Sequence, residues 1–97
     1  MNTRLSISRK GKGFEAINIV VANVPKELAV GDTFCLPLFG GKGGARVVGR
    51  HWKAEFLGEL VFMCEVSDTL WAELMKTAKA DANCHGSYTI QEQVWPT

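Results

Sequence analysis

The chain has 97 residues, of which 46% are hydrophobic and 22% charged, and its formal net charge is +1. A chain of this length can bury one core but not two, and its apolar fraction is too high for a disordered protein. Its three cysteines cannot all pair with one another, which argues against a secreted disulfide scaffold and favours a reducing compartment. We therefore expect one globular domain spanning residues 1–97.

The first part of the chain predicts a hairpin of two strands. Residues 4–8 alternate polar and apolar side chains, as a strand with one buried face does. Residues 9–13 hold two glycines and three basic side chains and are typical of a turn. Residues 14–24 are rich in β-branched side chains and predict the second strand.

A third strand is predicted over residues 33–39. Pro37 lies inside it and cannot donate a backbone hydrogen bond, so we expect this strand at a sheet edge or bulged at that point. Residues 40–44 contain four glycines and predict a flexible loop. They do not match a phosphate-binding loop, which needs a Lys-Ser or Lys-Thr pair opening a helix.

Two further strands are predicted near the middle of the chain. In residues 47–56 the even positions, beginning with Val48, are mostly apolar and the odd positions mostly polar. This alternation is typical of a half-buried strand. In residues 60–66 the even positions are wholly apolar and the odd ones only partly polar, so we expect this strand to be covered on both sides.

Residues 68–82 predict one amphipathic helix, with Ser67 among the side chains that offer an N-cap oxygen. Apolar side chains recur there at helical spacing: Leu70, Trp71, Leu74, Met75 and Ala78. Polar side chains take the opposite face: Glu73, Lys76 and Lys79. A last strand is predicted over residues 87–95.

These elements predict an α+β fold with five to six antiparallel strands and one helix late in the chain. Short strands joined by glycine-rich turns could close into a small antiparallel β-barrel. The competing arrangement is a strongly curved open sheet with the helix lying on it. The chain shows no internal repeat and no linker that would divide it.

No catalytic or metal-binding motif is recognisable. The possible metal ligands lack the paired spacing of structural zinc sites: Cys35, His51, Cys64, Cys84 and His85. No cysteine or serine has a recognisable nucleophile context. We therefore expect no metal, no cofactor and no enzymatic activity. A third-ranked hypothesis is an enzyme that uses Cys84, His85 and His51.

The net charge of +1 conceals an uneven distribution along the chain. Residues 1–53 hold nine Lys or Arg and three acidic residues, whereas residues 54–97 hold two Lys or Arg and seven acidic residues. Such asymmetry suggests an anionic partner, unless the fold mixes the two halves in space. The residues that would contact nucleic acid or another anion are Arg9, Lys10, Lys12, Lys42, Arg46 and Arg50.

Apolar side chains occupy more strand faces than one helix can cover. Residues 14–24 carry them on both faces, and so do residues 60–66. Either a barrel encloses this surplus, or another subunit or partner buries it. The candidate interface residues are Val61, Met63 and Trp95, the last because tryptophan is enriched at binding hot spots. The alternative is that Trp71 and Trp95 simply complete the core.

The leading hypothesis is a small non-enzymatic binding module that acts through protein–protein contacts as a homo-oligomer, with another protein as the alternative partner. By analogy with other small stand-alone chains, it would be an accessory or inhibitory protein of a mobile element. The alternative is a nucleic-acid-binding protein that uses basic glycine-rich loops. No signal-peptide core or bilayer-length apolar run is present, so we expect a cytoplasmic protein that does not bind membranes.

Overall fold

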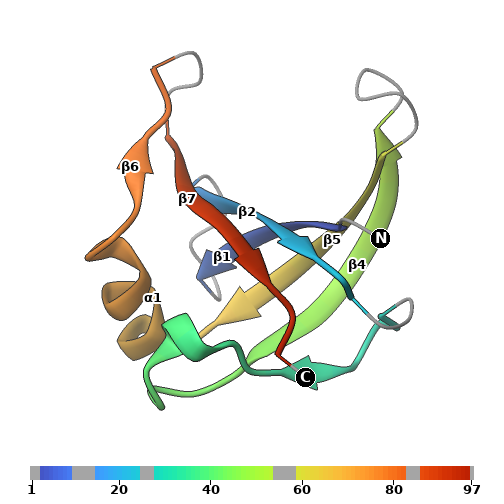
Figure 1. The fold of residues 1–97 in the computed structure, drawn as a ribbon, viewed down its shortest axis with the longest axis horizontal. Helices are drawn as coiled ribbons and strands as arrows, with labels where there is room; N and C mark the ends of the chain where they lie inside the picture. The colour runs from blue at the N-terminus through green and yellow to red at the C-terminus, as the bar shows by residue number, and fades with distance from the viewer. Residues whose placement is uncertain (1–2, 10–14, 25–27, 54–58, 83–85, 97) are drawn as a thin grey trace.

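The computed structural model describes residues 3–9, 15–24, 28–53, 59–82 and 86–96. Seven strands form one sheet in the order β3-β4-β5-β1-β2-β7-β6 (Figure 1). Their bounds are β1 Thr3–Arg9, β2 Ala16–Ala22, β3 Thr33–Phe34, β4 Ala45–Lys53, β5 Glu59–Val66, β6 Lys79–Ala80 and β7 Ser87–Val94. The domain is therefore α+β, as predicted, but it has more strands than the five to six expected.

The sheet is mixed, so the expectation of a wholly antiparallel sheet is wrong. The predicted hairpin of β1 and β2 is present, with Leu5 opposite Ile19. However, β1 pairs in parallel with β5, and β2 pairs in parallel with β7. Parallel neighbours need long crossover connections, and the segments between these strands in the chain supply them.

The sheet curves strongly but does not close (Figure 1). β3 and β6 are its two edges, and no strand pairing joins them within the described ranges. The end of β7 nevertheless approaches β3, because the rings of Phe34 and Trp95 lie 5.8 Å apart between centroids. The strongly curved sheet is thus confirmed, and the barrel is not supported.

One face of the sheet holds the core. Successive side chains of a strand point to opposite faces, which is why alternate positions of β1 and β2 are buried. The helix α1 (Asp68–Met75) and the short 3-10 helix η1 (Pro37–Phe39) lie together at one end of the sheet (Figure 1). Central members of the core are Leu5, Ile7, Ile17, Ile19, Val21, Phe62, Cys64, Leu70, Trp71 and Leu74.

A bulge changes which side chains of β4 face the core. Val47 is opposite Cys64 and is buried, whereas Val48 is 42% exposed. The register shifts between Val47 and Gly49, so beyond the bulge Arg50 stands opposite Phe62. The predicted apolar face of even residues is therefore wrong before the bulge, because an inserted residue reverses the alternation.

The helix begins where predicted and ends earlier. The Ser67 hydroxyl accepts a hydrogen bond from the backbone N–H of Leu70 at 3.2 Å, as an N-cap does. The helix stops at Met75 instead of residue 82, because residues 79–80 pair with β7 as β6. No helix in the part of the chain that the structure describes is long and apolar enough to cross a membrane.

The third predicted strand is only two residues long. Beyond Phe34 the chain leaves the sheet, and Pro37 begins η1. Gly40 ends η1 in the left-handed region, at φ 60°, where glycine carries no steric penalty. Pro37 therefore starts a helical turn instead of interrupting a strand, as its fixed φ favours.

We expect Gly44→Ala to destabilise the fold by about 1–3 kcal/mol, because it overpacks the contact between β3 and β4. A Cβ at Gly44 would lie 3.0 Å from the Thr33 methyl group and 3.1 Å from the backbone oxygen of Phe34. Gly49→Ala is the matched control, since its Cβ would meet Met63 at an ordinary 3.9 Å. Urea unfolding of both variants measures the difference; equal stabilities would contradict this packing.

Candidate functional site

The outer side of β7 is paired with another strand over only part of its length. β6 covers Tyr88 and Thr89. From Ile90 to Val94 the strand has β2 on one side and, among the described residues, no strand on the other. We call the outer side of Ile90–Val94 the open edge.

Hydrogen bonds show which backbone groups of the open edge turn outward. The N–H of Trp95 donates to the carbonyl of Ala22 in β2 at 2.9 Å. Backbone groups of successive strand residues alternate between the two sides, so those of Val94 turn away from β2. The carbonyl of Gln91 accepts a hydrogen bond from the side-chain amide of Gln93 at 2.8 Å. A backbone acceptor of β7 is therefore held by a side chain of the same strand, which an incoming N–H group can displace.

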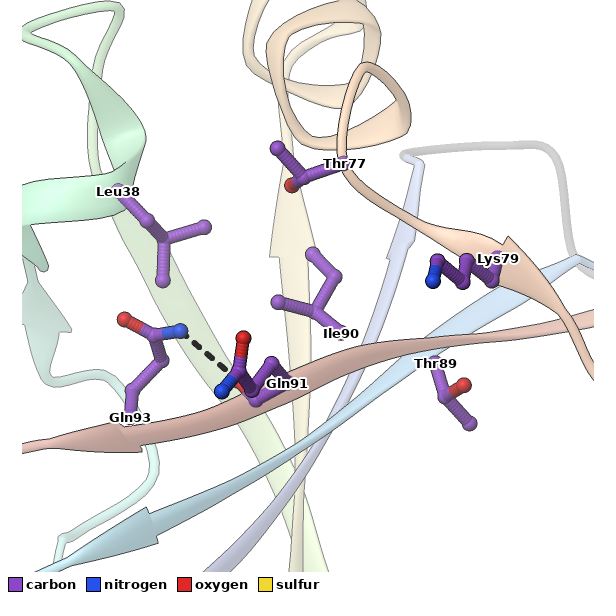
Figure 2. A pocket seen from close by; sticks show the side chains of 7 residues that line it. All are labelled: Leu38, Thr77, Lys79, Thr89, Ile90, Gln91 and Gln93. Atoms are coloured by element: carbon purple, nitrogen blue, oxygen red, sulfur yellow. Dashed lines mark hydrogen bonds between the residues drawn. The ribbon is translucent and has the colours of Figure 1, made fainter.

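A pocket of about 530 Å³ lies beside the open edge. This edge pocket is lined by Leu38, Thr77, Lys79, Thr89, Ile90, Gln91 and Gln93. Figure 2 shows Leu38 of η1, Thr77 and Ile90 pointing into one space, with Thr89 extending to the other side of β7. Its volume lies within the range of known ligand sites, and its lining combines an apolar floor with amide and hydroxyl groups.

Lys79 supplies the positive charge of the edge pocket. Its side chain extends from β6 toward the pocket, with the amine at the leading end (Figure 2). No described acidic group forms an ion pair with this amine, whereas Lys76 is paired with Glu73 at 2.9 Å. The Lys79 amine is therefore available to an anionic group that enters the pocket.

A second cluster joins α1 to the sheet near the start of β7. The Arg9 guanidinium is 3.2 Å from a Glu15 carboxylate oxygen and 5.1 Å from the centre of the Trp71 ring. The Tyr88 hydroxyl donates to the other Glu15 oxygen at 3.4 Å, and its ring meets Trp71 edge to face. Arg9 thus has an internal carboxylate and an aromatic ring as partners, and this cluster links α1 to the sheet.

The four predicted anion-binding residues that the structure describes do not lie at one place. Lys10 and Lys12 lie outside the described residues, and Arg9 belongs to the cluster with Trp71. Lys42, Arg46 and Arg50 are exposed. Arg46 stands opposite Glu65 and Arg50 opposite Phe62, so the two arginines leave β4 on opposite faces.

The predicted interface residues have three different environments. Val61 is 1% exposed, so the chain itself already covers it. Met63 is 45% exposed and lies on the sheet face opposite the core. Trp95 is half-buried and packs against Phe34. The described large hydrophobic side chains that remain exposed are Val30, Val48, Met63 and Val94.

The cysteines described by the structure show no arrangement for catalysis or metal binding. Cys35 is exposed, and its thiol lies 3.7 Å from the Gly43 carbonyl. Burial raises the pKa of the Cys64 thiol to about 12, which keeps it protonated and unreactive at neutral pH. No group of three metal-ligating side chains occurs within the described ranges. Cys84, His85 and the side chain of His51 lie outside the description.

Sequence reasoning did not single out the open edge or its pocket. Lys79 was assigned to the polar face of the helix, and Ile90 to an ordinary strand. The signal that could have indicated an edge is the polar run of residues 91–93, because edge strands commonly carry polar and charged side chains. The sequence does not show which side of that strand is open.

Comparisons of the chain with protein-family models, with curated proteins and with solved structures found no match.

Proposed function

We propose that the protein is a non-enzymatic binding module that holds an extended segment of another protein against the open edge of β7. The observation that carries this proposal is the outer side of Ile90–Val94, which no strand of the described residues pairs with, next to the edge pocket. A peptide that adds a strand to a sheet gains backbone hydrogen bonds, and pockets beside the edge select its side chains.

An added strand fits the dimensions of the open edge. Five strand residues span at most about 17 Å, which is the usual length of a strand in a globular protein. One bulge interrupts this span, because Ile90 faces Ile19 and Gln93 faces Val21, which leaves β7 one extra residue between them. The edge pocket lies along the same segment, between β7 and Leu38 of η1. The main chain of the ligand would therefore pair with β7 while one of its side chains enters the pocket.

A different protein suits this edge better than a second copy of the chain. Only four large hydrophobic side chains of the described residues are exposed, whereas stable homodimer interfaces are large and apolar. Antiparallel pairing of two β7 strands centred on Glu92 would also set two carboxylates directly opposite each other, which is destabilising.

The test starts from displayed random peptides of about ten residues. Enriched peptides are labelled, and their affinities are measured by fluorescence anisotropy for the wild type, Val94→Pro and Val94→Thr. Proline removes the outward N–H of residue 94 without removing a bond to β2, so we expect affinity to fall about tenfold or more. Threonine keeps the N–H and the β-branched shape, and we expect affinity within about twofold of the wild type.

Two outcomes overturn the proposal: no peptide is enriched, or Val94→Pro binds as the wild type does. Thermal melting checks that the proline variant is folded. If it is not, Leu38→Gln replaces it, because a polar floor in the edge pocket should also weaken binding. The nucleic-acid alternative would be favoured if no peptide is enriched and the protein binds a single-stranded oligonucleotide with an affinity that falls steeply as salt increases. Light scattering should show a monomer, and a dimer abolished by Val94→Pro would assign the edge to a second copy.

A further inference from the structure

The open edge is blocked at one end. β6 occupies the same side of β7, with Lys79 opposite Thr89 and Ala80 opposite Tyr88. A strand added beside Ile90–Val94 would lie in line with β6 and cannot continue past Thr89. The ligand chain must therefore end, or turn away, at Lys79.

The direction of the added strand decides which end of the ligand meets Lys79. A strand antiparallel to β7 runs from Val94 toward Ile90 and brings its carboxyl end to Lys79. A parallel strand brings its amino end there. The Lys79 amine has no ion-pair partner among the described residues and reaches toward the pocket (Figure 2). A terminal ammonium group would be repelled by it, whereas a terminal carboxylate would be attracted.

From these observations we infer that the open edge binds the carboxyl-terminal tail of its partner, antiparallel to β7, with the terminal carboxylate at the Lys79 amine. This inference rests on the proposed function and names the class of ligand. The apolar floor formed by Leu38 and Ile90 lies beside the point where the ligand chain ends. The tail therefore ends in a medium-sized apolar side chain, such as leucine, isoleucine or valine, that fills the edge pocket.

The experiment compares two pools of labelled six-residue peptides, about the length of the open edge. Both end in leucine with random residues before it; one pool has a free carboxylate and the other a carboxamide. We expect the wild type to bind the acid pool about tenfold more tightly, as a charge-assisted contact predicts. In Lys79→Gln the two pools should bind within about twofold of each other, and Lys79→Arg should keep the preference.

Lys76→Gln is the matched control, because it removes the same charge from an exposed lysine that is paired with Glu73 on α1. It should keep the wild-type preference for the acid pool. Equal binding of both pools by the wild type, or an unchanged preference in Lys79→Gln, overturns the inference. Edge-dependent binding of amidated or internal peptides would leave the proposed function standing, whereas failure of both pools and of the displayed peptides would remove both.

Discussion

Replacing Trp71 with alanine is expected to lower the free energy of unfolding by about 3–5 kcal/mol. The Trp71 side chain is 6% exposed and lies edge to face with Tyr88, at 6.5 Å between ring centres. The Arg9 guanidinium lies over the Trp71 ring, 5.1 Å from its centre, and the Nε of Arg9 is buried without a hydrogen-bond partner. The substitution thus opens a cavity between α1 and the sheet and removes the aromatic partner of a half-buried cation.

Urea unfolding, followed by circular dichroism, measures this loss. Lys76→Ala, at the C-cap of the same helix, is the control, and it should change stability by less than about 0.5 kcal/mol because the lysine is exposed. A double-mutant cycle with Arg9→Met should show a coupling of about 1 kcal/mol. If Trp71→Ala were no more destabilising than the control, the cluster would not hold α1 on the sheet.

Local signals predicted the elements whose pattern is decided within a few residues. The alternation of residues 4–8 and the β-branched run after Ala16 identified β1 and β2. In such strands every second side chain is buried, and this alternation is visible in the sequence itself. Ser67 was correctly placed at the start of the helix, since its hydroxyl caps a backbone N–H three residues later. The core position of Trp71 follows from helical spacing and is confirmed.

Tertiary pairing decided the elements that the sequence could not predict. Ala78, Lys79 and Ala80 favour helix by propensity, but residues 79–80 pair with β7. Likewise, Val48 has the side chain of a core residue, and the bulge before Gly49 turns it outward. Neither the bulge nor the parallel pairing of β1 with β5 has a local sequence signal, because both depend on strands that are distant in the chain.

The open edge was beyond sequence reasoning for the same reason. Its existence depends on the sheet order, which puts β7 beside a β6 of only two residues. The availability of the Lys79 amine depends in turn on the helix ending at Met75. Had the helix continued to residue 82, Lys79 would have lain on a solvated face with Lys76. The candidate site is thus a consequence of where one helix stops.

Raising the pH above 9 is expected to destabilise the protein through Cys64. This thiol is fully buried in the sheet, and its burial raises its pKa from the ordinary 9.0 to about 12. Below pH 9 the thiol is protonated in both the folded and the unfolded state and adds no pH dependence. Between these two pKa values the unfolded chain loses the proton and the folded chain keeps it, so stability falls as pH rises.

The expected loss of stability is large enough to measure, and a Cys64→Ala variant distinguishes it from the effects of the other titrating groups. Each pH unit between the two pKa values lowers the free energy of unfolding by about 1.4 kcal/mol. The loss is about 2 kcal/mol at about pH 10.5 and reaches about 4 kcal/mol once the pH has passed the pKa of the folded state. Cys64→Ala has no thiol to ionise, while every other titrating group is unchanged. The stability difference between wild type and variant, measured by urea unfolding at several pH values, should therefore shrink above pH 9. Parallel pH curves for the two proteins would show that Cys64 is not buried as the structure places it.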